Sequence, residues 1–510
     1  MIWPFNNRNK ETKPAQAPAP ARLRGFSGAQ IGRLTNSWLV KSQSIDWDIQ
    51  KSLTILQARS RDLCTNNDYG RKFLQMCATN VVGPTGFDLA VRVKEIGAGG
   101  EVKVDKLASD AIKSAFWDWA KRGNCDVTGK HSFFDICNLY IKGAAREGEV
   151  LIRKVYGTQA GKYGFQLQIL DIDRLDVEKN DRRLANGNII KMGVEVTPYG
   201  RPVAYHLRIS HPGDNPYYTY AGTFYEVIPA EDVYHHFISD RPEQTRGIPW
   251  LVSAMMRLQN LGGYEEAAVI AARVGASKMG FFTTPDGDGT ALADDTEGEN
   301  GAGDLITDAE PGAFPVLPEG YGFEPFNPDY PHAMYKDFVK TVLRGVASGI
   351  GVAYNTLAND LEGVNFSSIR SGVIEERDNW MALQNWMIEN LLDDLFSTWL
   401  KFALLSGAVK TTTGAALPVA KFDKFNAAVW KGRRWQWVDP EKDANANITL
   451  IDNGLRSRSD VVSEQGGDFD ETLDALAEEQ KKMEKLGLKI VQKTSGAAEK
   501  KPAEPPPEGN

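Results

Sequence analysis

Two adjacent histidines, His235 and His236, are the best candidates for metal or acid–base chemistry in this sequence. Asp240 follows them closely, and Asp171 and Asp173 lie upstream. Imidazole and carboxylate groups both bind metals and transfer protons. Because adjacent side chains on a strand point to opposite faces, only one of the two histidines could serve one site. The alternative is that both histidines are structural and that the two upstream aspartates are turn residues.

A second candidate is a cluster of tryptophan and arginine between Trp430 and Trp437, which contains Arg433, Arg434 and Trp435. Such rings can stack on single-stranded bases. An interface or core edge, with arginine stacked on tryptophan, is the more common use of this composition.

The motifs that define several enzyme classes are missing. The sequence has no P-loop, no H-E-x-x-H and no G-x-S-x-G, and the glycines at 97–100 lack the third glycine of a dinucleotide site. The segment from Asp286 to Thr290 begins like a calcium loop, but Ala291 occupies the position that needs glycine. We therefore predict no cofactor and no metal. The cysteines form no C-x-x-C pair and are expected to be reduced, partly buried thiols; they are Cys64, Cys77, Cys125 and Cys137.

The charge balance is acidic, with a formal net charge of −8 over 510 residues. A conventional double-stranded DNA binder carries a basic patch, so any contact with DNA is expected to be weak. No apolar run reaches the roughly 18 residues of a transmembrane helix, and no signal peptide is predicted. Residues 1–24 and 491–510 are rich in proline and charge and are expected to be disordered.

The C-terminal half is organised around a polar segment between two helices. Helical spacing of apolar residues covers residues 333–350 and, without a proline, residues 367–406. Between them, residues 354–366 are rich in Asn, Asp and Gly, a composition that predicts a loop. An ordinary helical hairpin in a large core would show the same pattern.

The ends of the long helix carry local signals. Ser367 and Ser368 are suitable N-caps, and Gly407 stands where a helix would stop. The apolar residues expected on one face are Ile369, Val373, Trp380, Leu383, Met387, Leu391, Leu395, Trp399 and Phe402.

The N-terminal half is expected to be α+β. Residues 37–80, 107–122 and 132–147 show helical patterns, with a helix end near residue 67 and a new helix from Asp68. Residues 233–249 predict a loop that leads into a helix over 250–277. Strands are expected at 148–155, 165–170, 189–196, 204–209, 225–228 and 281–284, and a hairpin is expected to join 87–93 to 101–104.

Several segments, taken in order, carry a resemblance to a known family. They are RSRDLCTNNDYGRKFLQMCATNVVGPTG (59–86), Trp119 with Cys125, Asp126 and Gly129, REGEVLIRK (146–154), LQILDIDRLD (167–176), GRPVAYH (200–206), IPAEDVYHHFISDRPEQTRGIPWL (228–251), YEEAAVIAARVGAS (264–277) and VNFSSIRSGVIEERD (364–378). The set resembles the lambda family of tailed-phage portal proteins over roughly residues 25–460. The last segment is close to the family's Asn-Tyr-Ser-Ser-x-Arg signature, with Phe366 in the place of tyrosine.

The resemblance implies a portal-type α+β fold divided into named regions. They are a wing (25–249), a first stem helix (250–279), a clip (280–332), a second stem helix (333–353), a channel or tunnel loop (354–366), a long helix (367–406) and a helical crown (407–490).

The resemblance also implies three sets of site residues. The channel loop would present Tyr354, Asn355, Asn359, Asp360, Glu362 and Asn365. The signature at the junction of loop and helix is Asn365, Phe366, Ser367, Ser368 and Arg370. The clip would face terminase and the adaptor with Asp286, Asp288, Asp294, Asp295 and Glu297.

The charge of the loop fits a conduit. Each Lys or Arg that contacts a phosphate adds affinity by releasing counterions, so a channel through which DNA slides should hold few of them. Residues 354–366 contain no Lys or Arg but do contain Asp360 and Glu362. The sequence alone therefore predicts an acidic lining that binds DNA weakly.

The implied function is structural and not enzymatic. The resemblance implies a homo-oligomeric ring of about twelve subunits at the portal vertex of the virion, assembled in the host cytoplasm. The implied partners are double-stranded DNA that is packaged and ejected, the terminase large subunit, head–tail adaptor proteins, the major capsid protein and scaffold, with no membrane. Two alternatives stay open: a metal-dependent phosphoesterase that uses Asp171, Asp173, His235 and His236, and a scaffold through which no DNA passes.

Overall fold

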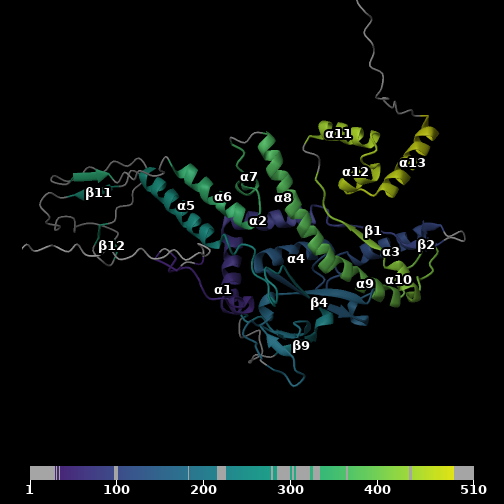
Figure 1. Cartoon of the computed structure of the whole chain (residues 1–510), viewed down its shortest axis with the longest axis horizontal. Coiled ribbons are helices and arrows are strands. Elements are labelled where there is room, and N and C mark those ends of the chain that lie inside the picture. The colour runs from purple at the N-terminus through teal and green to yellow at the C-terminus, as the bar shows by residue number, and fades with distance from the viewer. Residues whose placement is uncertain are drawn as a thin grey trace, which may run out of the picture.

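The computed structural model describes residues 29, 31–33, 35–96, 101–181, 183–214, 225–276, 280–283, 299–300, 304–305, 322–325, 334–362, 366–435 and 439–487. Every pair of named strands among these residues is antiparallel, and helices contain more residues than strands do. This combination confirms the α+β class. A central body of helices and sheets carries a projecting helix pair, and a group of short helices lies on another side (Figure 1).

The first two helices form because strong caps define their ends. Ser44 accepts a hydrogen bond from the Trp47 backbone N–H (3.3 Å), and Asn67 accepts two, from the N–H groups of Tyr69 and Gly70. The predicted break before Asp68 is confirmed. The elements are α1 (Ile45–Asn66), α2 (Asp68–Cys77) and a π-helical turn (Ala78–Val82).

Two further helices pack on this layer. The N-terminus of the second carries a capping box between Ser132 and Asp135, and its C-terminus closes with Gly148 at φ +88°, a conformation that glycine adopts without strain. The predicted helices are confirmed within three residues at each end. The elements are α3 (Lys106–Trp119) and α4 (Phe133–Glu147).

Two antiparallel sheets lie beneath these helices. The three-stranded sheet has the order β10 (Val233–Phe237), β4 (Glu149–Tyr156), β5 (Phe165–Leu170), with Leu151 opposite both Leu170 and His235. The four-stranded sheet has the order β6 (Ile189–Lys191), β7 (Val194–Val196), β8 (Pro202–Arg208), β9 (Tyr225–Pro229).

Two strand predictions were wrong. Residues 233–237 form strand β10 and not a loop, because their alternate side chains pack on opposite faces of the three-stranded sheet. Residues 189–196 form a hairpin and not one strand, because Met192 (φ 48°) and Gly193 (φ 84°) both have positive φ, as a tight two-residue hairpin turn requires.

The predicted hairpin between residues 87–93 and 101–104 was only partly right. Strands β2 (Lys94–Ile96) and β3 (Val102–Val104) do pair. However, β1 (Asp88–Val91) pairs with β15 (Ala428–Lys431) from the C-terminal part of the chain. Local alternation cannot reveal such a distant partner.

The projecting helix pair consists of α5 (Met255–Ala276) and α6 (Tyr335–Ile350) (Figure 1). Tyr264 packs on Tyr335 and Phe338, with ring centroids 5.6 and 4.9 Å apart. Residues 250–254 form turns, so the first helix begins later than predicted. Between the two helices lie short strands: β11 (Gly280–Thr283), β12 (Glu299–Asn300), β13 (Asp304–Leu305) and β14 (Gly322–Pro325).

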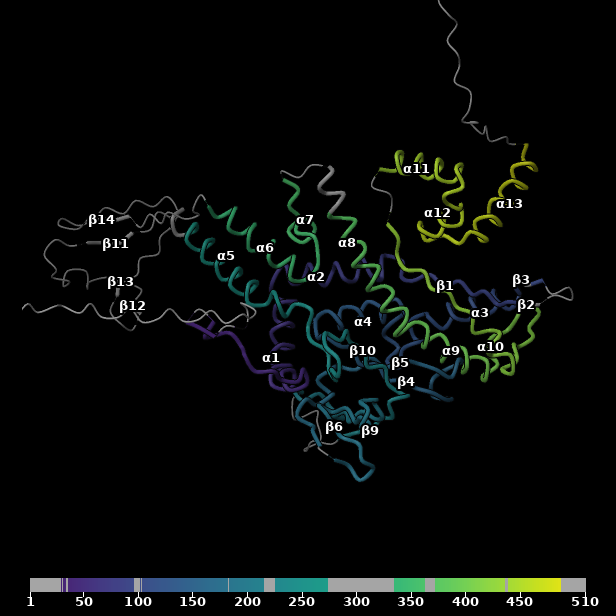
Figure 2. The backbone as a smooth tube through the Cα atoms, in the orientation of Figure 1, coloured from purple at the N-terminus to yellow at the C-terminus, as the bar shows by residue number. Residues whose placement is uncertain are grey.

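The long predicted helix runs along the body of the molecule (Figure 2). It comprises α8 (Phe366–Met387), a π-helical segment (Ile388–Leu392) and α9 (Asp393–Leu405). Gly407 closes it with φ +67°, as predicted. The predicted N-caps were wrong, since Ser367 and Ser368 already lie inside α8. Before it comes the short helix α7 (Tyr354–Ala358).

Aromatic side chains fill the centre of the main core. Phe116 and Trp119 of α3 meet Phe396 and Trp399 of α9, and Phe116 and Trp399 are 5.0 Å apart in an edge-to-face pair. All four are 0% exposed. Rings of this size bury large apolar areas, so this cluster holds the long helix on the body.

The C-terminal elements are small helices tied down by charge. Asp468 caps the last helix and pairs with Arg92 and with Lys431, whose Nζ lies 3.3 Å away. The elements are α10 (Phe422–Phe425), α11 (Pro440–Asp452), α12 (Arg458–Glu464) and α13 (Phe469–Leu486), and they lie in the part of the chain that was expected to be helical.

Candidate functional site

The candidate channel loop is only partly a loop. Tyr354 and Asn355 lie in α7, and Asn359 ends that helix with φ +52°, which asparagine tolerates well. Asp360 and Glu362 follow. The prediction of an irregular segment was wrong for residues 354–358. The composition rich in Asn, Asp and Gly applies mainly to the residues that come after them.

The remaining predicted residues of the loop and junction are described less completely. Asn365 lies outside the described residues. Phe366, Ser367, Ser368 and Arg370 belong to the first turns of α8. The clip residues Asp286, Asp288, Asp294, Asp295 and Glu297 lie outside the described residues.

The two loop carboxylates are paired with lysines of α6. Lys340 Nζ lies 3.0 Å from Asp360 Oδ2 and 3.5 Å from Glu362 Oε2. Lys336 Nζ lies 2.5 Å from Glu362 Oε2. The expectation of an acidic lining therefore needs correction, because the carboxylate charges are balanced by cations that precede the loop in the sequence.

Tyr354 and Arg344 of α6 complete this arrangement. The Tyr354 hydroxyl donates to Asp360 Oδ2 (2.8 Å), and the guanidinium of Arg344 lies 5.5 Å from the centre of the tyrosine ring. Hydrogen bonds from Tyr354, from the Glu362 backbone N–H and from Lys340 lower the pKa of Asp360 to about 2. Asp360 is thus ionised at neutral pH and available to hold the lysine.

The other side of α7 is anchored to α8 by Glu376. Its carboxylate accepts hydrogen bonds from Thr356 Oγ1 (2.9 Å) and Trp380 Nε1 (3.3 Å). Burial raises the pKa of Glu376, and these bonds oppose the rise. The segment between the two helices is therefore attached on both sides.

The structure does not assemble the proposed phosphoesterase site. His235 and His236 point to opposite faces of β10, as predicted: His235 Nε2 lies 2.9 Å from Glu149 Oε2, while the Tyr140 hydroxyl lies 3.0 Å from His236 Nδ1. Asp171 and Asp173 lie instead with His211. The four residues named for catalysis thus belong to separate clusters.

An arginine occupies the aspartate cluster. Arg61 bonds both oxygens of Asp173, at 2.6 and 2.7 Å, and also pairs with Glu147 at 2.9 Å. Asp171, Asp173 and His211 form the only group of three potential metal ligands among the described residues. Burial raises the pKa of Asp173, but Arg61 outweighs this, and the net shift is downward. A salt bridge explains this cluster without a metal.

The most buried charged centre was not predicted from the sequence. Arg246 and Glu149 are 0 and 1% exposed, and the Arg246 Nη2 lies 2.6 Å from Glu149 Oε1. Gln57 and His235 also contact Glu149. The sequence around Arg246 or Glu149 does not distinguish either residue from a surface charge. The one signal was the position of Glu149 at the start of an apolar strand, which indicates a buried partner.

The tryptophan–arginine cluster serves the core edge. Trp430 packs on Phe116 with centroids 5.5 Å apart, and Trp435 stacks near Arg433 at 5.6 Å. Arg434 Nη1 bonds Gln384 Oε1 at 3.1 Å. The structural alternative is confirmed for these residues, and Trp437 lies outside the described part.

The four cysteines are free and buried, as expected for thiols, and burial raises the pKa of Cys64 to about 11.

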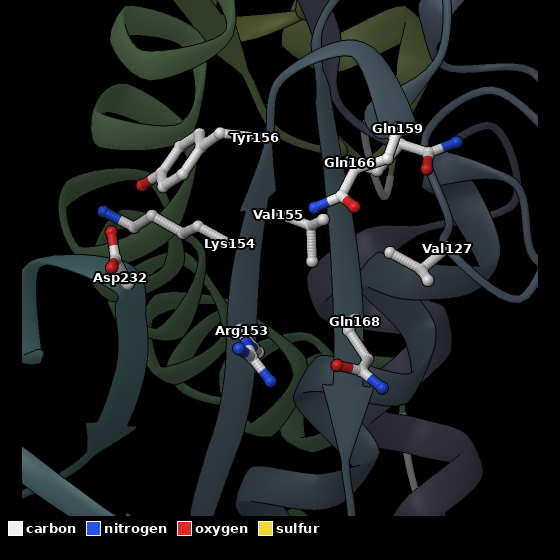
Figure 3. A pocket seen from close by; sticks show the side chains of 9 residues that line it. All are labelled: Val127, Arg153, Lys154, Val155, Tyr156, Gln159, Gln166, Gln168 and Asp232. Carbon is white, nitrogen blue, oxygen red and sulfur yellow. The ribbon is translucent and has the colours of Figure 1, made fainter. Parts of the chain in front are cut away.

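A cavity of about 470 Å³ lies against strands β4 and β5 (Figure 3). Its charged lining is already engaged. Arg153 pairs with Glu226 (2.8 Å), and Lys154 pairs with Asp394 (3.0 Å). Gln166 donates to the Asn124 carbonyl (3.1 Å). Three of its polar side chains thus have partners within the protein, and we assign no site to the cavity. The helices of the described part also include none long and apolar enough to cross a membrane.

A pH effect on stability is expected from His236. Burial lowers its pKa to about 3, and His235 and Lys154 act in the same direction. A histidine in the unfolded chain has a pKa near 6.5. Below that pH, His236 therefore binds a proton in the unfolded chain but stays neutral in the folded chain. The stability that the neutral, buried His236 allows is fully present above about pH 6.5 and is lost as the pH falls toward 3. Urea midpoints at pH 7.5 and 5.0 should show a smaller drop for His236→Gln than for the wild type.

The control is Gln75→Ala, which changes an exposed and uncharged side chain. It should keep the wild-type pH dependence. An equal drop in the His236→Gln and wild-type proteins would show that this histidine is not the group responsible.

The sequence comparisons identify the class of protein. The profile of the phage portal proteins of the lambda family matches residues 31–384, from the segment before α1 into α8. The chain belongs to the lambda family of phage portal proteins. This is a family of structural proteins and not of enzymes.

Two phage relatives agree with this assignment. A probable portal protein of Halomonas phage phiHAP-1 is 36% identical, and the match covers 94% of this chain and 90% of the relative. Portal protein B of Escherichia phage lambda is 21% identical over 91% of this chain and 90% of its own length. Among solved structures, the neck of an empty GTA particle matches with a TM-score of 0.42 and 11% identity, over 82% of this chain and 94% of that chain.

Proposed function

We propose that this chain forms a closed ring of about twelve subunits at one capsid vertex, through which double-stranded DNA enters and leaves. The observation that carries the proposal is the family match from residue 31 to 384. It includes α6, the candidate channel loop and the start of α8. A segment held between α6 and α8 is a suitable position for a channel lining.

The regions of such a ring would follow the chain order. Residues 25–249 would be the wing, α5 and α6 the stem helices, residues 280–332 the clip and residues 407–490 the crown. The side-by-side packing of α5 and α6 supports the stem assignment (Figure 2). The proposed partners are the terminase large subunit and head–tail adaptor proteins at the clip, and the capsid protein and scaffold around the wing.

The test is the mass and symmetry of the purified protein. Native mass spectrometry together with negative-stain class averages should show a ring near twelve-fold, with a central hole of about 20 Å or more for duplex DNA. The same sample incubated with scaffold protein provides the control for assembly. A monomer or dimer under both conditions would contradict the proposal.

The phosphoesterase alternative is not proposed. Its four named residues lie in three separate environments, those of His235, of His236 and of the aspartate pair, and each has a structural explanation in its own contacts. A scaffold without DNA passage would give a ring whose central hole is too narrow for a duplex, so the class averages decide that alternative as well.

A further inference from the structure

Three cations lie in a row on helix α6. Lys336, Lys340 and Arg344 are spaced four residues apart, so they project from the same side of the helix. Each step spans about 6 Å at 1.5 Å per residue. In one strand of B-DNA, a phosphate and the next but one are about 6.8 Å apart along the helix axis. The row therefore has a spacing that could follow a phosphate backbone.

The candidate loop covers each member of the row. Glu362 pairs with Lys336, Asp360 pairs with Lys340, and the ring of Tyr354 lies beside Arg344. Carboxylates thus stand where phosphate oxygens would bind, and an aromatic ring lies beside the guanidinium. All three covering groups come from one segment of nine residues, 354–362.

The cover is weak enough to be displaced. The side chains of Lys336 and Glu362 are 59 and 64% exposed, and Arg344 is also exposed, so solvent screens these contacts. Asp360 and Lys340 are less exposed, at 18 and 22%, and Tyr354 orients the carboxylate. The attachment of Asp360 is therefore the stronger part of the cover, and Glu362 is the part that a competing anion would displace first.

We propose that Lys336, Lys340 and Arg344 form a binding row for the phosphodiester backbone of nucleic acid, and that Asp360, Glu362 and Tyr354 mask it. With the mask in place, passing DNA meets balanced charge and slides. With the loop displaced, the row is exposed and grips the backbone. This inference rests on the proposed function for its ligand, but the site itself is defined by the contacts of one subunit.

The test is the affinity of the full chain for a labelled 20-base-pair duplex, measured by fluorescence anisotropy over a salt series. The double variant Asp360→Asn/Glu362→Gln should bind at least about fivefold more tightly at low salt than the wild type. For this variant, the plot of log affinity against log salt concentration should have a steeper slope, by up to about 0.9 for each added phosphate contact. Adding Lys336→Gln, Lys340→Gln and Arg344→Gln to this variant should return the affinity to the wild-type level.

The matched control is Glu478→Gln/Glu479→Gln on α13. It removes the same two charges from exposed positions far along the chain from the row. A second variant, Tyr354→Phe, keeps every charge but removes the hydrogen bond that orients Asp360, and should give a smaller gain in the same direction. Circular dichroism spectra of each variant should match that of the wild type, which checks that the variant is folded.

The outcomes separate this inference from the proposed function. If Asp360→Asn/Glu362→Gln and the control bind DNA equally, the loop is only anchored to α6 and the masked site is disproved, whether or not the protein forms a ring. If the variant gains affinity while the wild type shows no ring by mass, the phosphate site stands and the conduit proposal fails.

Discussion

Replacing Arg246 by alanine is expected to lower the free energy of unfolding by about 3–5 kcal/mol. The guanidinium is completely buried and bonds both oxygens of Glu149. It also donates to the carbonyls of Leu175 (3.0 Å) and Met192 (2.9 Å). Removing it leaves a buried carboxylate without its main counter-charge, and an uncompensated buried charge is far more costly than a missing surface pair.

The size of the effect follows from where this pair lies. Glu149 begins β4, and the carbonyls that Arg246 contacts belong to the segments around the four-stranded sheet. Gln57 of α1 donates to the same carboxylate at 3.2 Å. One buried pair therefore joins the helical layer to both sheets, and its loss should loosen all three.

The measurement is urea unfolding followed by circular dichroism. Arg201→Ala is the matched control, because Arg201 is exposed and its hydrogen bonds with Thr197 are made by its backbone, which alanine keeps. The double variant Arg246→Met/Glu149→Leu, which removes both charges, should recover part of the lost stability. If Arg246→Ala unfolds at the same urea concentration as Arg201→Ala, the pair is not a stabilising centre.

Replacing Trp399 by alanine is expected to destabilise the body by a similar amount, about 3–5 kcal/mol. Trp399 is 0% exposed and contacts Phe116, Phe396 and Tyr163, with centroids 5.0, 5.7 and 6.1 Å away. Alanine would leave a large cavity where α9 meets α3. Because α9 continues α8, the loss should also weaken the support of the candidate channel loop.

Phenylalanine provides a sharper version of this test. The Trp399 indole N–H is buried and has no hydrogen-bond partner within the described structure, so Trp399→Phe removes a polar group that gains nothing there. The indole of Trp119, in contrast, donates to the Phe165 carbonyl at 2.8 Å. Trp399→Phe should therefore cost less than Trp119→Phe. Leu405→Ala, at a 58% exposed position of α9, is the control; a Trp399→Ala midpoint equal to that of Leu405→Ala would refute the prediction.

Local rules predicted most of the helices. Apolar residues at steps of three and four located α3, α4, α6 and the long helix, and Gly407 marked the end of the last of these. These features depend on residues within one or two turns, so the sequence contains the whole signal. The start of α8 was misplaced because serine caps and serines inside a first turn look alike in a sequence.

Long-range partners could not be predicted in the same way. Strand β1 pairs with β15, Glu149 pairs with Arg246, and Asp171 and Asp173 meet Arg61 and His211 and not the paired histidines. Each partnership depends on the path of the chain in space. The candidate site shows the consequence most clearly, because the loop appears acidic when its residues are counted in isolation.

By itself, the sequence determined the α+β class, the positions of the main helices, the lack of the common catalytic motifs and the resemblance that the family match confirms. Only the tertiary structure decided that Lys336 and Lys340 balance Glu362 and Asp360, and that the histidines and aspartates serve separate structural clusters. The physical reason is that helical periodicity and capping act between near neighbours, whereas charge pairing and strand pairing depend on which distant segments the fold brings within a few ångströms.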